Sequence, residues 1–546
     1  MTEMLRYSIL LYCNIAPGSH PMDKLILAWS ALGIYVLVTL ALAWRGWRRT
    51  TSVASFATGG GALSPWVVGL ALAAQLTSVA TFVVNPGLVF AYGLSGLLGF
   101  GVAAALGITA GLVLFSSAFR RVGEQGKALT VPQWIGARYG SRGLSVGFGV
   151  LSLGLVSYAV LIVVALAYVL GLLLGLPPWL PALGLILFVF GYVAFGGANA
   201  HASTNAVQAG IMLVVALLLI GSGLPSLWQG EGLFSALAAQ DAALVQVTNP
   251  ASLYFRNLFE VLVCNFLVGL ALVCQPHILS KALYVKSDRE VRQYLGVAIA
   301  VGTVFMMMMW VGLFARVELP AATSIDTVVP LYIASHFGPG LQVLISIGLL
   351  CAGISTLEGL VLAISAICSV DLFLVPLSQR LMPGKSLEQR GRVALIVGRA
   401  SIAVAALVTG LLSLQQLANP TGGSVAIFAQ YGIYGLITAS IVPLAAGMFI
   451  PSATGRQVTA GALTALAAYV GAGAFGFTSM ANNPAFLATT GIAAGWLAFG
   501  LARLVSAVGV TYGEQERPSV RRDDDAPAHG VRNAPASRRP SFEHGA

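Results

Sequence analysis

The feature that most constrains this chain is a succession of long apolar stretches, each about as long as a helix that crosses a bilayer. Such a helix needs about 20 mainly apolar residues. Thirteen stretches approach or exceed this length, near residues 25–44, 64–87, 95–118, 144–174, 180–197, 204–225, 255–278, 295–316, 339–370, 394–416, 423–450, 457–476 and 485–507. The sequence therefore predicts an all-α integral membrane protein with about 13 transmembrane helices.

The composition supports a lipid environment. The 546 residues are 57% hydrophobic and 9% charged, whereas soluble domains carry roughly 25% charged residues. The net charge of +10 does not indicate nucleic-acid binding, because the positive residues lie in short loops between apolar stretches. The five cysteines show no metal-type spacing and exclude a disulfide framework; they are Cys13, Cys264, Cys274, Cys351 and Cys368.

The distribution of Lys and Arg predicts the orientation in the membrane. If alternate loops face the cytoplasm, only four of the 29 Lys and Arg residues fall outside, namely Arg6, Lys24, Arg256 and Arg316. Cytoplasmic loops carry an excess of these residues. We therefore expect a multi-pass protein of the cell membrane with its N-terminus outside, its C-terminus inside and an odd number of spans.

The chain divides into five predicted segments. Residues 1–21 form a lead whose apolar stretch, Tyr7 to Ala16, is too short to span a bilayer, and Met22 is an alternative start. Residues 22–63 contain the first helix and a cytoplasmic loop, residues 64–450 a ten-helix transporter core, and residues 451–512 two further helices. The tail, 513–546, is rich in Pro, Ala, Arg and Asp, a composition typical of disorder. No soluble catalytic domain is expected.

The second and seventh spans are interrupted by polar residues and by Pro or Gly. The second has Thr77-Ser78, then Thr81, and ends in Asn85-Pro86-Gly87; the seventh has Gln275-Pro276-His277. These patterns fit hydroxyls bonded back to their own helix and a proline kink. They equally fit unwound segments that line a binding site, as in transporters. The second interpretation assigns substrate binding to Ser78, Thr81, Asn85, Gln275 and Pro276.

The ninth span carries Ser355-Thr356 and, soon after, Glu358. Two adjacent hydroxyls inside the membrane suit a hard monovalent cation, which takes neutral oxygen ligands. An ionisable residue inside a span indicates function by default. Glu358 is therefore a candidate for ion coupling, although a locally paired structural carboxyl remains an alternative.

Four stretches, in this order, resemble the sodium:solute symporter family. They are Thr77 to Gly87 with Tyr92-Gly93; Gly196-Gly197 with Thr204-Asn205 and Gln208; Gln275-Pro276-His277-Ile278 with the basic loop through Arg292; and Ser355-Thr356 with Ser369-Val370-Asp371. The resemblance covers roughly residues 25–505. It implies a LeuT-like core of ten helices in a 5+5 inverted repeat, here spans two to six and seven to eleven.

The resemblance also implies a sodium ion as the co-transported cofactor. By position, its ligands would be the carbonyl oxygens of Ala74, Thr77 and Ala352 and the hydroxyls of Ser355 and Thr356. The family often has Asp where this chain has Asn205, and some members have Asp in place of Leu76. Asn205 is therefore the second candidate for coupling. Glu358 leaves proton coupling as an alternative.

The resemblance narrows the solute without identifying it. Sugar-transporting members place polar groups where this chain has Ala80, Phe100 and Cys274, which argues against a sugar. Proline-transporting members share the Gln-Pro-His-Ile run, and monocarboxylate members share Pro-His-Ile-Leu. We expect sodium-coupled symport of a small monocarboxylate or an amino acid such as proline by alternating access.

Two alternatives remain open: a proton-coupled permease of the same fold, and a membrane sensor that does not transport. An intramembrane enzyme is disfavoured because no His/Asp or Cys/His set clusters at one membrane face. A channel is disfavoured because repeated filter sequences are absent. The expected partners are a small-molecule substrate and the lipid bilayer, with no nucleic acid and no metal ion other than sodium.

Overall fold

The structure is a computed structural model that describes residues 21–48, 50, 52–59, 63–321, 323, 325–419, 425–476 and 480–515. The described residues form helices and connecting turns without a strand. The predicted lead before Pro21 and the tail after Gln515 lie outside the described residues. The chain divides into two units at Ala502, and the second begins at Arg503 within the last helix.

The first half of the chain begins with a peripheral helix and contains the first bent span. Its elements are α2 (Pro21–Trp47), α3 (Val53–Thr58), α4 (Pro65–Leu76), η2 (Ala80–Val84), α5 (Asn85–Tyr92), α6 (Leu94–Gly96), η3 (Leu97–Ala104), α7 (Ala105–Gln125), α8 (Val131–Arg138), α9 (Arg142–Ser152), α10 (Leu155–Leu174), α11 (Trp179–Gly223), η4 (Leu224–Leu227), α12 (Leu233–Gln240) and η5 (Ala242–Val245).

The second half contains the second bent span and the most buried long helix, α18. Its elements are η6 (Phe259–Cys264), α13 (Asn265–Leu272), α14 (Pro276–Leu279), η7 (Ser280–Tyr284), α15 (Asp288–Met306), α16 (Met309–Glu318), η8 (Ile325–Thr327), α17 (Val328–His336), α18 (Pro339–Ile367), η9 (Cys368–Leu374), α19 (Ser378–Leu381), α20 (Leu387–Ala418), α21 (Val425–Phe449), α22 (Gly455–Phe475) and α23 (Pro484–Gln515).

Ten helices of the described residues are long and apolar enough to cross a membrane. Two helix pairs are bent by more than 40° and add two spans if each pair is one. The difference from the predicted thirteen lies in α11, which we expected to be two spans separated by a loop near 198–203. Instead of a loop, a kink joins two helical segments within α11, and Gly197 at the kink has non-helical angles, φ 60° and ψ −162°. The count of thirteen remains a prediction that requires α11 to cross twice.

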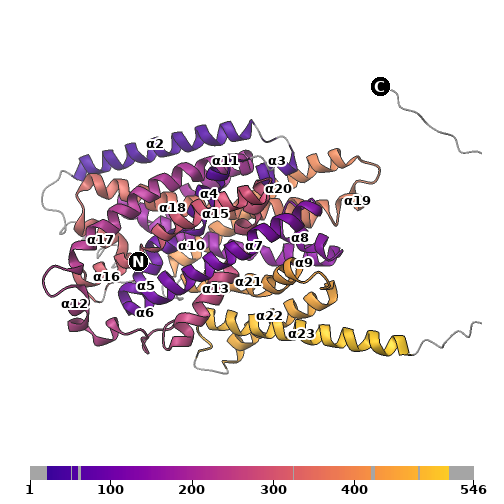
Figure 1. Ribbon diagram of the computed structural model, residues 1–546. Coiled ribbons are helices and arrows are strands. Elements are labelled where there is room, and N and C mark those ends of the chain that lie inside the picture. The colour runs from indigo at the N-terminus through magenta and orange to yellow at the C-terminus, as the bar shows by residue number, and fades with distance from the viewer. Residues whose placement is uncertain are drawn as a thin grey trace, which may run out of the picture. The chain divides into compact units, whose positions relative to one another are not determined.

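The interior of the bundle is built around α18. Its residues are buried over nearly its whole apolar length, and it packs against α4, α10, α11 and α20. By contrast, α2 lies along one edge of the bundle (Figure 1) and contacts mainly α11 and α18. The described part of the chain therefore surrounds one helix with the others, and that helix carries Ser355, Thr356 and Glu358.

Glycines allow both bent spans to approach their neighbours closely. A Cβ on Gly69 of α4 would lie 2.7 Å from the carbonyl oxygen of Tyr294, and one on Gly312 would lie 2.1 Å from that of Pro86 in α5. Two glycines allow α13 and α7 to approach in the same way. A Cβ added to Gly269 would lie 2.3 Å from Ala104 O, and one added to Gly107 would lie 2.1 Å from Phe266 O. Small residues at such crossings are typical of membrane helices.

Candidate functional site

The first bent span positions the predicted sodium ligands. Its halves, Pro65–Leu76 and Ala80–Tyr92, meet at 53°. Thr77 ends α4 with φ −109° and ψ 81°, so the helical hydrogen-bond ladder stops there. Backbone oxygens in the last turn of α4 consequently lack their usual amide partners and become available to another helix.

The hydroxyl pair of α18 faces these oxygens. Ser355 Oγ donates to Ala74 O and to Ala352 O, each at 3.0 Å, and Thr356 Oγ1 lies 3.2 Å from Gln75 O and 3.4 Å from Ala352 O. Both side chains are fully buried. Four of the five predicted ligand residues therefore meet in one place, where neutral oxygens converge from two helices.

Thr77, the fifth predicted ligand, takes no part in these hydrogen bonds. The atom predicted as a ligand is its carbonyl oxygen, whereas its hydroxyl donates to Ala73 O at 2.6 Å. The oxygen that meets Thr356 belongs instead to Gln75, which the sequence did not single out. One interpretation of this span was that its hydroxyls donate to carbonyl oxygens of their own helix. The Thr77 hydroxyl does so.

The predicted substrate residues fall into two groups. Ser78 is buried beside α10, where its Oγ accepts from Tyr158 at 2.7 Å, and Thr81 is buried in η2. Asn85 is partly buried at the start of α5. Gln275 and Pro276 lie at the break of the second bent span, whose halves meet at 56°. Ser78 lies at the first break, Thr81 and Asn85 lie in the half-span after it, and the other two residues lie at the second break.

Glu358 does not join the hydroxyl cluster and points to α11 instead. Its carboxylate accepts from Thr204 at 2.6 Å, from Gln208 at 3.1 Å and from the Tyr192 hydroxyl, and it lies 3.2 Å from His201 Nδ1. Asn205 lies on the same face of α11 and donates to Ser355 O at 3.1 Å. The two coupling candidates therefore lie next to the hydroxyl pair on two different helices, Glu358 on α18 and Asn205 on α11.

The sequence indicates only some of the residues that surround the Glu358 carboxylate. Thr204, Asn205 and Gln208 belong to the run that resembles the family, whereas His201 and Tyr192 lie outside it. The signal was present, because residues 201, 204, 205 and 208 have the spacing of one helix face. Helix α2 joins the network as well, since Gln208 donates to the Tyr35 hydroxyl at 2.8 Å.

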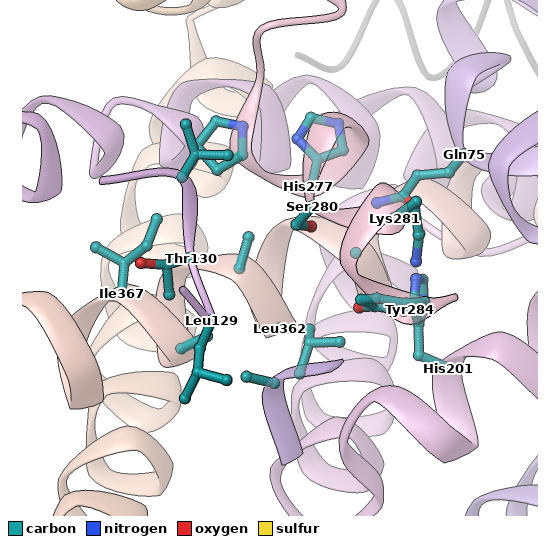
Figure 2. Close-up of a pocket in the computed structure, with 16 residues that line it drawn as sticks. Gln75, Leu129, Thr130, His201, His277, Ser280, Lys281, Tyr284, Leu362 and Ile367 are labelled. Atoms are coloured by element: carbon teal, nitrogen blue, oxygen red, sulfur yellow. The ribbon is translucent and has the colours of Figure 1, made fainter. Parts of the chain in front are cut away.

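A cavity lies beside the hydroxyl cluster, at the second break. Gln75, Pro276, His277 and Lys281 line it together with His201 (Figure 2). The Lys281 side chain is 1% exposed, although the sequence had indicated only a loop charge. Figure 2 shows the ends of Lys281 and His201 directed toward each other, with Gln75 and Tyr284 nearby.

The comparisons with known proteins agree with this architecture. The model of the sodium:solute symporter family matches residues 56–437. An uncharacterized symporter, YwcA, of Bacillus subtilis (strain 168) is 24% identical over 73% of this chain and 76% of its own length. The sodium/pantothenate symporter of Haemophilus influenzae is 24% identical over 58% of this chain, and the osmoregulated proline transporter OpuE of B. subtilis is 26% identical over 48%. These two matches span 65% and 53% of the relatives' own lengths.

Among solved structures, a substrate-bound, outward-open Na+-coupled sialic acid symporter has the same fold. It matches with a TM-score of 0.71 at 17% identity, over 87% of this chain and 97% of its own. The chain belongs to the sodium:solute symporter family. It is a multi-pass membrane transporter rather than an enzyme, and it couples the symport of small solutes to sodium. The family, the all-α fold class and the co-transported ion expected from the sequence are confirmed.

Proposed function

We propose that this family member carries a small monocarboxylate, or an amino acid such as proline, inward with sodium by alternating access. The observation that carries the proposal is the meeting of Ser355 and Thr356 with the backbone oxygens of Ala74 and Ala352. A cation that enters this cluster exchanges water oxygens for protein oxygens. The relatives that transport pantothenate and proline support a small solute that bears a carboxylate.

In this proposal the sodium site comprises Ala74, Thr77, Ala352, Ser355 and Thr356, and Gln75 O lies at its edge. The solute binds at the breaks, near Ser78, Thr81, Asn85, Gln275 and Pro276. An inside-negative potential of 100 mV contributes about 2.3 kcal/mol per sodium ion to inward transport. Sodium bound between α4 and α18 holds the two helices together, so ion and solute affinity are linked reciprocally.

Uptake assays test this function directly. Radiolabelled acetate, pyruvate, L-proline and pantothenate would be offered to vesicles that contain the full chain, with sodium or with potassium as the only alkali cation. We expect sodium to stimulate the uptake of at least one of them. Uptake driven by a pH gradient and indifferent to sodium would contradict the proposal.

We also propose that the protein lies in the cell membrane with its N-terminus outside and its C-terminus inside. Contacts between distant loops support the alternation. Arg120 and Asp288, both predicted to be cytoplasmic, form an ion pair at 2.8 Å, and Asn483 donates to Glu260 at 3.1 Å on the predicted outer side. Reporter fusions within residues 226–254 and at Gly513 should locate to opposite sides, and the same side for both would contradict this topology.

A further inference from the structure

We propose that the cavity at the second break holds the carboxylate group of the transported solute, with Lys281 as its counter-ion. The inference rests on the proposed function and deepens it, because it names the charged group that the protein recognises. It also gives Lys281 a role as a binding residue rather than a topology signal.

The first observation is a buried ammonium group that lacks a carboxylate partner. Among the described residues, no carboxylate oxygen lies within 4.0 Å of Lys281 Nζ, and its close contact is the Tyr284 ring, 4.6 Å away. Burying an isolated ammonium group is strongly unfavourable unless it gains a partner. A solute carboxylate would supply that partner.

Glu358 does not fill this role, although it attracts Lys281 electrostatically. Tyr192, Thr204 and Gln208 already donate to its two oxygens, and His201 lies between Glu358 and the lysine. Because a carboxylate accepts hydrogen bonds, His201 Nδ1 is the donor to Glu358 and Nε2 is left as an acceptor, without a hydrogen-bond partner among the described residues. His201 therefore offers no donor to an anion in this cavity.

The second observation is a set of other polar groups without partners around the same cavity. The Gln75 amide and both ring nitrogens of His277 are buried and have no hydrogen-bond partner among the described residues. Gln75 and His277 can each present an N–H to an anion. No Asp or Glu is among the residues that line the cavity. The lining therefore offers a cation and N–H donors to a carboxylate, beside two unpartnered acceptors, Gln75 Oε1 and His201 Nε2.

Gln75 connects this cavity to the ion site. Its backbone oxygen lies 3.2 Å from Thr356 Oγ1, and its side chain lines the cavity beside Gly359. One residue thus contacts the sodium cluster through its backbone and the proposed carboxylate site through its amide. In the predicted orientation the cavity lies on the cytoplasmic side of the cluster, on a route of release.

A binding assay with propionate and its neutral counterpart propionamide tests the proposal on the purified full chain. At fixed sodium and ionic strength, propionate should raise the melting temperature and propionamide should not. Lys281→Met should abolish the propionate shift, Lys281→Arg should preserve most of it, and Lys286→Met, at an exposed lysine in the same basic segment, should leave it unchanged. Equal shifts from both compounds in the wild-type chain, or none from propionate, would overturn the proposal even if Lys281→Met does not fold.

Transport separates this proposal from the proposed function. In reconstituted vesicles, Lys281→Met should lower carboxylate uptake roughly 10-fold or more, as expected for one lost charge-assisted hydrogen bond. The sodium concentration for half-maximal uptake should stay within about 2-fold of wild type. If wild-type uptake is sodium-dependent and Lys281→Met matches Lys286→Met, only the carboxylate site is refuted. If wild-type uptake does not depend on sodium, the proposed sodium-coupled function is refuted.

Discussion

The two bent spans differ in how they break, although their bends of 53° and 56° are almost equal. The first has no proline at its break, and α4 simply unwinds at Thr77. The second restarts at once, because Pro276 follows an extended Gln275 and occupies the first turn of α14. Proline fits that position since it has no amide hydrogen to leave unpaired.

This difference decides which atoms each break presents. At the second break, Gln275 O accepts from the amides of Ile278 and Leu279, both at 3.0 Å, so the backbone is largely satisfied within the span. At the first break, Ala74 O and Gln75 O meet hydroxyls from α18. An unwound break therefore offers backbone oxygens, which suit a cation. A proline break offers side chains, here Lys281 and His277.

Removing the hydroxyls opposite the first break should have the largest effect. Ser355→Ala or Thr356→Ala deletes an oxygen that the buried ion needs in place of water. Losing a buried polar contact costs about 1–3 kcal/mol, which corresponds to roughly 5- to 150-fold weaker sodium affinity. Sodium titration of uptake should show this increase in half-saturating concentration, and excess sodium should partly restore transport.

Ser365→Ala is the matched control on the same helix. Ser365 is also fully buried, but its hydroxyl donates to Gly398 O at 2.8 Å, away from the break. Its loss should lower the melting temperature and leave the sodium response unchanged. If Ser365→Ala and Ser355→Ala shift the sodium response equally, the effect reflects general loosening of α18 and the first break has no special role.

A smaller effect is expected where the first break meets the solute. Tyr158→Phe removes the donor to Ser78 Oγ, and a single hydrogen bond contributes about 0.5–1.5 kcal/mol. The solute concentration for half-maximal uptake should rise roughly 2- to 12-fold, while sodium affinity measured without solute stays constant. Tyr139→Phe, which removes a hydroxyl bonded to Pro443 O at 2.7 Å, is the control and should change neither value.

Much of this arrangement follows from the sequence because it depends on local chemistry. Apolar length predicted the spans, and the hydroxyl pair of α18 together with the polar break near Thr77 predicted where an ion site would form. The kink at Gly197 marked the boundary between two predicted spans, but a loop was expected because six residues with modest apolarity separate them. The structure has a kink there and helical residues directly after it.

The rest depended on which side chains meet across helices, and one sequence does not show this. Gln75 rather than Thr77 contacts Thr356, and this depends on how α4 is rotated relative to α18. Lys281 was assigned to a solvated loop because positive residues near span ends usually face water. The second break turns that residue inward instead.

The smallest effect on transport is expected at Glu358, one turn beyond the hydroxyl pair. If sodium drives transport, this carboxylate serves to hold α11 against α18, and Glu358→Gln should leave sodium half-saturation within about 2-fold, less than 0.5 kcal/mol. The pH dependence of uptake should also change little.

The cost should appear in stability, because the new amide nitrogen cannot accept a hydrogen bond and leaves buried donors among Tyr192, Thr204 and Gln208 unpaired, at about 1–3 kcal/mol. Thermal unfolding would show a lower melting temperature, whereas Glu388→Gln, at an exposed ion pair with Arg392, should unfold as wild type. If Glu358→Gln abolishes uptake driven by a pH gradient while the Ser355 and Thr356 variants keep their sodium response, then coupling resides in the α11 network. The oxygens of the first break would then be structural, and the proton-coupled alternative would replace the sodium site proposed here.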